Sequence, residues 1–268
     1  IEANDHQVFV LENNGAILMF NRDELLKSEQ PVSAEAGRIE GYGAFTVNHR
    51  GSIMCGAALS ERKADIIDTT TMNMQDTLII PDLAMTSPPV FSPCDSLLFC
   101  SRRLFDMRQK NAIHTFDVLS NYHGGMFTTD GLEILIDAEL WDLRMLKLRK
   151  RNGLLNGCYS QPIDNEVFIS FKYDNTEDHS SDSVTFDTVF SVFDMDCNLI
   201  NRTNIVDSCY QYTKAVDKGY IYGYPSAFMP KKQIGLIARM ERSKVLVFGF
   251  GENYRSFVDS LESSSDDG

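Results

Sequence analysis

The chain has 268 residues, of which 43% are hydrophobic, and its formal net charge is -13. Such a chain can bury a large core, which excludes disorder for most of its length, and its negative charge disfavours phosphate backbones and anionic lipid as partners. No stretch approaches the roughly eighteen apolar residues of a membrane helix, and residues 1–5 lack a signal-peptide pattern. We therefore expect a soluble, intracellular protein.

Short β-strands separated by Gly, Asn, Asp and Pro are predicted along the whole chain. Residues 7–11 and 16–20 are predicted to be inner strands of a sheet, joined by a tight turn at Asn14-Gly15. The unit restarts at Gly43, and its strands are predicted at residues 45–51, 52–59, 64–68 and 78–80. Phe91 and Phe127 begin two further units.

The second half of the chain continues this pattern. The polar run at residues 175–182 is predicted to be an exposed loop. The predicted strands lie at residues 167–173, 189–194, 205–212, 219–222, 233–240 and 244–250. Because no segment keeps a helical apolar period for long, the sequence predicts an all-β fold.

One pentapeptide pattern recurs in the middle of the chain. Leu-Phe-Asp-Met-Arg occupies residues 104–108, and Leu-Trp-Asp-Leu-Arg occupies residues 140–144, so the two runs lie 36 positions apart. Each follows a turn and an apolar strand in a longer repeated unit. A unit of about forty residues with Trp-Asp near the end of a strand is typical of a WD-repeat β-propeller.

This fold class leads to a division of the chain into two parts. Residues 1–252 are predicted to form a β-propeller of about five to six blades, and residues 253–268 a short disordered acidic tail. Because the chain is predicted to begin within a blade and propellers need closure to hide their sheet edges, we expect a full propeller of seven blades with its leading blades outside this sequence.

The arginines of the two pentapeptides are the main candidates for function. Arg108 and Arg144 are predicted to emerge on one rim of neighbouring blades, where planar guanidinium groups would form a bidentate docking surface. The alternative is that each arginine pairs with an aspartate or a backbone carbonyl of its own blade. Trp141 is predicted to pack between blades and Asp142 to bond a turn amide, so neither is a catalytic candidate.

The sequence offers little support for an enzyme, a metal site or a cofactor. It has no Gly-x-Ser-x-Gly elbow, no phosphate-binding glycine loop, and five scattered histidines. The six cysteines form no Cys-x-x-Cys pair and are expected to be free thiols. Asp194 and Asp196 lie at a strand end and are predicted to cap a turn.

Five segments between Thr77 and Arg149 carry a resemblance to a known family, whose segments occur in the same order. They are Ile-Pro-Asp-Leu-Ala at 80–84, Phe-Ser-Pro-Cys-Asp at 91–95, Ala-Ile-His-Thr-Phe-Asp at 112–117, Asp-Gly-Leu-Glu-Ile-Leu-Ile at 130–136 and Leu-Trp-Asp-Leu-Arg at 140–144. This part of the chain resembles the Vpr-binding protein family, the WD-repeat substrate receptors of cullin-4 RING E3 ubiquitin ligases. The likeness is weaker from there to Phe250 and only general before residue 40.

The resemblance implies a role for each residue of the repeated pentapeptide. In that family, tandem Trp-Asp-x-Arg motifs on adjacent blades dock on the adaptor called damage-specific DNA-binding protein 1. By motif position, Arg108 and Arg144 would bind the adaptor, with Asp106, Trp141 and Asp142 in support. Phe105 replaces the first Trp, from which we expect weaker packing but retained docking.

The resemblance also implies a ubiquitin ligase subunit that presents protein substrates and has no catalytic residues, metal or cofactor. Nuclear localisation is expected, with a cytoplasmic population as well. The basic cluster at residues 147–151 predicts a solvated rim or a weak import signal rather than direct nucleic-acid contact. The alternative is a WD-repeat scaffold for protein interactions with no link to a ligase, and neither reading involves a membrane.

Overall fold

The computed structural model of the chain contains two compact units. The first comprises residues 1–175 and 186–207, and the second comprises residues 176–185 and 208–268. The residues described are 2–27, 35–83, 88–109, 111–118, 124–163, 165–177, 184–205, 224–229, 234–239 and 244–249.

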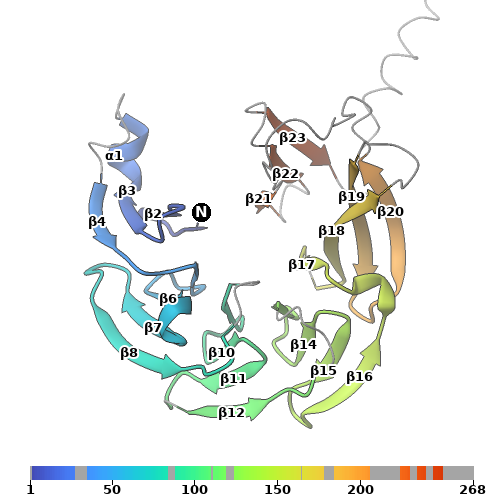
Figure 1. Ribbon diagram of the computed structural model, residues 1–268, viewed down its shortest axis with the longest axis horizontal. Helices are drawn as coiled ribbons and strands as arrows, with labels where there is room; N and C mark the ends of the chain where they lie inside the picture. The colour runs from blue at the N-terminus through green and yellow to red at the C-terminus, as the bar shows by residue number, and fades with distance from the viewer. Residues whose placement is uncertain are drawn as a thin grey trace, which may run out of the picture. The chain divides into compact units, whose positions relative to one another are not determined.

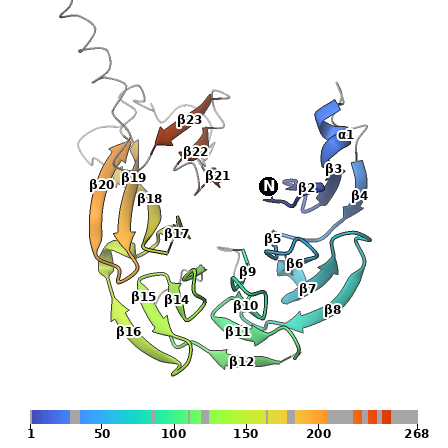
Figure 2. The ribbon, with the colours of Figure 1, turned by 180° about the vertical axis from the view of Figure 1, so that it is seen from behind.

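Five four-stranded sheets, named blades 1 to 5, make up the first unit, apart from the tips of two strands of blade 5 (Figures 1 and 2). Blade 1 contains β1 (Glu2–Ala3), β2 (Gln7–Leu11), β3 (Ile17–Asn21) and β4 (Glu35–Ile39), with the helix α1 (Arg22–Lys27) between β3 and β4. Blade 2 contains β5 (Ala44–Val47), β6 (Ile53–Ala58), β7 (Lys63–Asp68) and β8 (Met74–Ile79).

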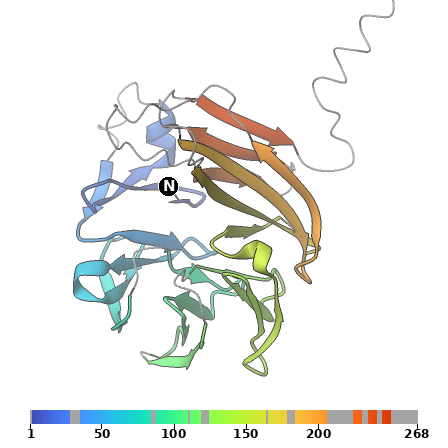
Figure 3. The same cartoon turned by 45° about the vertical axis from the view of Figure 1, so that its right-hand side comes forward.

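The other three blades repeat this plan. Blade 3 contains β9 (Val90–Phe91), β10 (Leu97–Cys100), β11 (Arg103–Asp106) and β12 (Ala112–Thr115). Blade 4 contains β13 (Gly125–Phe127), β14 (Glu133–Ile136), β15 (Glu139–Asp142) and β16 (Lys147–Arg151). Blade 5 contains β17 (Tyr159–Pro162), β18 (Val167–Glu177), β19 (Val184–Asp194) and β20 (Leu199–Ile205), whose long strands run from olive to orange in Figure 3.

Consecutive blades are packed against one another in the order of the chain. The first strand of each blade contacts the first strand of the next, from β1 through β5, β9 and β13 to β17. Most of the apolar core lies between the blades, because four buried clusters each combine side chains of two neighbouring sheets. Phe9 and Phe45 share one such cluster, which joins blades 1 and 2. A single blade therefore cannot bury its apolar faces without its neighbours.

The second unit contains one antiparallel three-stranded sheet among its described residues. Its strands are β21 (Tyr224–Met229), β22 (Ile234–Arg239) and β23 (Lys244–Gly249). In the described part of the chain no helix is long and apolar enough to cross a membrane.

Most of the strands predicted from the sequence are confirmed. The Asn-Gly turn is present, since Gly15 has φ of +85° and the Glu12 N–H donates to the Ala16 carbonyl over 2.8 Å. The four strands predicted after Gly43 correspond to β5 to β8 of blade 2. The strands predicted at 233–240 and 244–250 correspond to β22 and β23. The predicted all-β character is confirmed, with α1 as a six-residue exception.

Three predictions about elements need correction. β1 completes the first sheet with four strands, where the sequence predicted that the chain begins within a blade. Residues 175–177 were predicted to belong to a loop but continue β18, since polar residues are compatible with a sheet that faces solvent on one side. β4, β17 and β21 were not predicted at all, and β20 ends at Ile205, where the sequence predicted that a strand begins.

Several predictions lie outside the described residues. They concern residues 178–182 of the polar run, residues 206–212 and 219–222, and the acidic tail at 253–268. The predicted boundary at residue 252 also falls there.

Candidate docking surface

A turn of the same geometry follows the third strand of each blade of the first unit. The N–H of the first residue after the third strand donates to the carbonyl oxygen of the residue just before the second strand, over 2.8–3.1 Å. The donor and acceptor residues are Arg22 and His6, Thr69 and Ser52, Met107 and Ser96, Leu143 and Leu132, and Met195 and Glu166. These five turns can therefore be compared residue by residue.

The last residue of each third strand organises the turn through its side chain. These residues are Asn21, Asp68, Asp106, Asp142 and Asp194 in blades 1 to 5. In blades 1 to 4 the side-chain oxygen accepts the N–H of the residue two positions further on, over 2.8–3.0 Å, which closes an Asx-turn. In blade 5 it accepts the Asn198 N–H over 2.7 Å. The predicted turn-capping roles of Asp142 and Asp194 are confirmed.

The residue two positions after this side chain differs between blades. It is Asp23, Thr70, Arg108, Arg144 and Asp196 in blades 1 to 5. Where the Asx-turn forms, it needs only the main-chain N–H of this residue, so an acid or a threonine serves as well as an arginine. Among the five described turns, arginine stands at this position only in blades 3 and 4. The turn itself therefore does not require an arginine at this position.

Each arginine pairs with the aspartate of its own turn, as the alternative interpretation of the sequence predicted. Arg108 donates from Nε to Asp106 Oδ1 over 2.9 Å and from Nη2 to Oδ2 over 2.5 Å. Arg144 donates from Nη2 to Asp142 Oδ2 over 2.7 Å. The arginine side chains are nevertheless 86% and 66% exposed, whereas the aspartate side chains are 12% and 11% exposed. Each carboxylate thus orients a guanidinium that solvent or a partner can reach.

The ion pairs shift the acidity of both aspartates in the same direction. The hydrogen bond from Arg108 is the main cause that lowers the pKa of Asp106 to about 2, and the hydrogen bond from Arg144 does the same for Asp142. Both carboxylates therefore stay charged at neutral pH and hold the arginines in place.

The titration of Asp142 is a direct check of this pairing. NMR of the folded chain should show a side-chain pKa of about 2 for Asp142, below the ordinary value of 3.8. Because the folded-state pKa is lowered, the stabilisation from the pair is present above the ordinary value and is lost as the pH falls from 3.8 towards 2. In the Arg144→Ala variant, the pKa of the Asp142 side chain should lie nearer to 3.8. The same titration in the variant and the wild type would contradict the pairing.

The aromatic residue before each aspartate packs between two blades. Phe105 is 1% exposed and shares a cluster with Ile66 and Leu78 of blade 2. Trp141 packs against the cluster that joins blades 3 and 4, with its ring 5.3 Å from that of Phe116. The predicted position of Trp141 is confirmed. The ring of Phe105 is likewise enclosed between blades, and weaker packing than with a tryptophan stays a prediction.

The basic cluster at residues 147–151 has a structural role at the junction of blades 4 and 5. Arg149 donates to the Glu133 carboxylate over 2.5 and 2.7 Å and also pairs with Asp196. Lys150 Nζ donates to the Asp196 carbonyl over 2.6 Å and to Asn198 Oδ1 over 2.7 Å. These charges are therefore largely matched by neighbouring acceptors.

Metal and thiol chemistry find little support in the part of the chain that the structure describes. Its five cysteines are free, and of these only Cys94 is exposed. Cys209 lies outside the described residues. Within the described stretches, no three potential metal-ligating side chains gather in one place.

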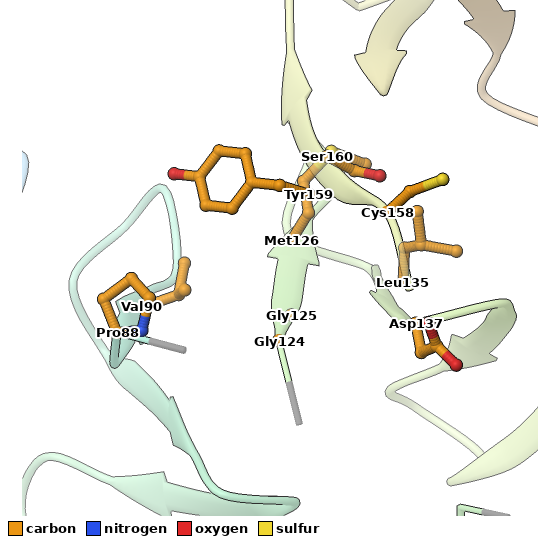
Figure 4. A pocket seen from close by; sticks show the side chains of 10 residues that line it. All are labelled: Pro88, Val90, Gly124, Gly125, Met126, Leu135, Asp137, Cys158, Tyr159 and Ser160. Carbon is orange, nitrogen blue, oxygen red and sulfur yellow. The ribbon is translucent and has the colours of Figure 1, made fainter. Parts of the chain in front are cut away.

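A small pocket lies between the first strands of blades 3, 4 and 5 (Figure 4). Its lining residues are Pro88, Val90, Gly124, Gly125, Met126, Leu135, Asp137, Cys158, Tyr159 and Ser160. Asp137 accepts the Gly157 N–H over 2.5 Å, so its carboxylate holds a loop. Among these lining residues there is no histidine or lysine to serve as a general base beside a nucleophile.

The sequence predicted turns at the strand ends of blades 3, 4 and 5, but it indicated an equivalence only for those of blades 3 and 4 and missed the turns of blades 1 and 2. Strand-end Asn21 and Asp68 carried the only available signal, a short polar side chain followed by turn residues. That signal is common in loops. The equivalence becomes visible only through the shared backbone hydrogen bond.

No family model matches the chain. Its fold is similar to that of the WD40 domain of Toxoplasma gondii coronin, with a TM-score of 0.64, 9% identity, and coverage of 94% of this chain and 67% of that chain. It is also similar to Kuenenia stuttgartiensis hydrazine synthase, with a TM-score of 0.68, 11% identity, and coverage of 99% and 78%. At these identities the likeness shows the fold alone. The chain is thus a WD-repeat β-propeller protein.

Curated relatives match part of the chain. "DDB1- and CUL4-associated factor homolog 1" of Caenorhabditis elegans is 32% identical over 143 residues, which cover 44% of this chain and 8% of that protein. Its Arabidopsis thaliana namesake is 40% identical over 58 residues, or 22% of this chain and 3% of that protein. Protein mahjong of Drosophila melanogaster is 29% identical over 130 residues, or 48% and 8%.

These relatives confirm the resemblance found in the sequence. Part of the chain is similar to WD-repeat proteins of the Vpr-binding, or DDB1- and CUL4-associated factor 1, family. The matched part spans less than a tenth of the length of these relatives.

Proposed function

We propose that this chain is a substrate-recognition subunit of a cullin-4 RING E3 ubiquitin ligase and that it acts in the nucleus. In this role it docks on the adaptor damage-specific DNA-binding protein 1 and presents protein substrates for ubiquitination. Two of its relatives carry the name DDB1- and CUL4-associated factor homolog 1, which supports this class of partner.

The observation that carries the proposal is the arginine pair on adjacent blades. Arg108 and Arg144 stand at equivalent positions where the turn itself needs no arginine, and their carboxylate partners orient them towards solvent. Guanidinium groups bind carboxylates and carbonyl groups in a planar, bidentate manner. A partner that presents such acceptors at the spacing of two blades would bind this rim.

The proposal assigns the chain no catalytic residue and no cofactor. Its contribution is binding, since ubiquitin transfer would be carried out by the other subunits of the ligase. A scaffold without a ligase is the second candidate, because WD-repeat propellers such as the coronin domain share the fold. The adaptor separates the two candidates, since a scaffold outside the ligase has no reason to bind it.

Binding of the full chain to the purified adaptor tests the proposal. We expect the two proteins to form an equimolar complex in size-exclusion chromatography, and cullin-4 to join the complex through the adaptor. Calorimetry should give a matching stoichiometry. Failure of the folded chain to bind the adaptor would contradict the receptor function and favour the scaffold.

A further inference from the structure

The surroundings of the two arginines differ although their turns are equivalent. Position by position, Leu132 of blade 4 corresponds to Ser96 of blade 3, and Met145 corresponds to Gln109. Leu132 is 40% exposed and Met145 is 63% exposed. Ser96 and Gln109 are also exposed. Arg144 therefore has exposed apolar neighbours where Arg108 has polar ones.

Leu132 and Met145 are tied to the same turn as Arg144. The Leu132 carbonyl accepts the Leu143 N–H over 2.9 Å. The Met145 N–H donates to Asp142 Oδ1 over 3.0 Å, and this oxygen also accepts the Arg144 N–H over 2.8 Å. The two apolar side chains thus start from backbone that is fixed to the turn of Arg144. We call Leu132 and Met145 the apolar collar.

The electrostatic surroundings of the arginines differ as well. Asp106 is the carboxylate that acts on Arg108, whereas Asp142, Glu133 and Asp130 all act on Arg144. The side chain of Arg108 is also the more exposed of the two, at 86% against 66% for Arg144, so its charge is more accessible to solvent and to an approaching partner. Long-range attraction of an acidic partner depends mainly on Arg108 for this reason.

We infer, on the basis of the proposed function, that the two arginines divide the work of adaptor binding between them. Arg144 is the anchor, because the apolar collar packs on the adaptor around it and excludes water from its hydrogen bonds. Arg108 is the steering charge, which speeds association and remains solvated in the complex. Residues that anchor an interface are typically surrounded by contacts that exclude water, whereas rim charges change the association rate and its dependence on salt.

The adaptor is the occupant of the collar because the collar is continuous with the arginine surface. The main-chain N–H groups of Arg144 and Met145 donate to the same oxygen, Asp142 Oδ1. A partner that reaches Arg144 therefore also approaches Met145. Exposed apolar side chains beside an anchoring arginine gain free energy when such a partner covers them. Leu132 and Met145 are thus further specificity-determining residues of the docking surface.

Association and dissociation rates of adaptor binding, measured by surface plasmon resonance at several salt concentrations, test this division. The variant Leu132→Ser/Met145→Gln gives blade 4 the residues of blade 3 and should dissociate about tenfold faster, with the salt dependence of the wild type. Arg108→Ala should associate about tenfold more slowly at low salt and lose part of the salt dependence. Arg144→Ala should dissociate about thirtyfold faster at all salt concentrations.

The matched control removes exposed apolar side chains from another place. Ile79 and Ile113, at the outer strands β8 and β12, are 66% and 44% exposed. The variant Ile79→Gln/Ile113→Ser should bind like the wild type, and thermal melts should show that all variants are folded.

The outcomes separate this inference from the proposed function. If the wild type binds the adaptor but the collar variant dissociates at the wild-type rate, the division of roles is wrong and the receptor function stands. Equal salt dependence for Arg108→Ala and Arg144→Ala would also overturn the division. If the wild type does not bind, both the function and the inference are wrong.

Discussion

Replacing Arg108 and Arg144 together with alanine is expected to abolish adaptor binding and to leave the melting temperature nearly unchanged. Removal of the anchor Arg144 together with the steering charge of Arg108 should weaken binding by about a hundredfold or more. The fold loses little, because exposed ion pairs are screened by water and salt and because the turn amides still donate to Asp106 and Asp142. Co-purification with the adaptor and a thermal melt measure the two quantities.

A second pair of exposed arginines supplies the control for this variant. Arg38 is 39% exposed and pairs with Glu12 and Glu40, and Arg50 is 80% exposed in a turn of blade 2. The variant Arg38→Ala/Arg50→Ala removes the same net charge and should keep adaptor binding. If the Arg108→Ala/Arg144→Ala variant binds as well as this control, the docking surface lies elsewhere on the chain.

The architecture was largely predictable because the repeated sequence pattern lies within the strands themselves. Residues 104–108 and 140–144 have the same pattern, and the structure places them at the ends of β11 and β15 with the same pairing to β10 and β14. The sheet in the second unit was harder to predict. Proline is unfavourable within a strand, and Pro225 lies in β21 next to a register shift, where a bulge accommodates it.

The candidate site was predictable only in part. The sequence places Arg108 and Arg144 at equivalent positions, but it cannot show which acceptor an exposed side chain takes. The structure resolves this in favour of the aspartate of the same turn. The equivalence of the turns of blades 1, 2 and 5 to these two was missed because their loops and strands differ in length. The same backbone hydrogen bond recurs in all five turns, although the number of residues between one turn and the next varies.

Replacing Phe105 with alanine is expected to lower the free energy of unfolding by about 3–5 kcal/mol. The ring is 1% exposed and lies in the cluster that joins blade 3 to Ile66 and Leu78 of blade 2. Its loss would leave a cavity in the cluster that joins these two sheets. Urea unfolding of the variant and the wild type measures the difference. A change below about 1 kcal/mol would show that the blades can close over the cavity.

The companion variant Phe105→Trp, which restores the family motif, should also be destabilising rather than helpful. In blade 4 the Trp141 indole N–H donates to Glu139 over 3.3 Å. The position that corresponds to Glu139 in blade 3 is Arg103, a donor that already pairs with Asp82 over 2.9 Å. A tryptophan there would be larger than the enclosed ring and would meet a donor in place of an acceptor, at a cost of about 1–3 kcal/mol. If urea unfolding instead shows a gain in stability, the departure from the motif is not coupled to Arg103.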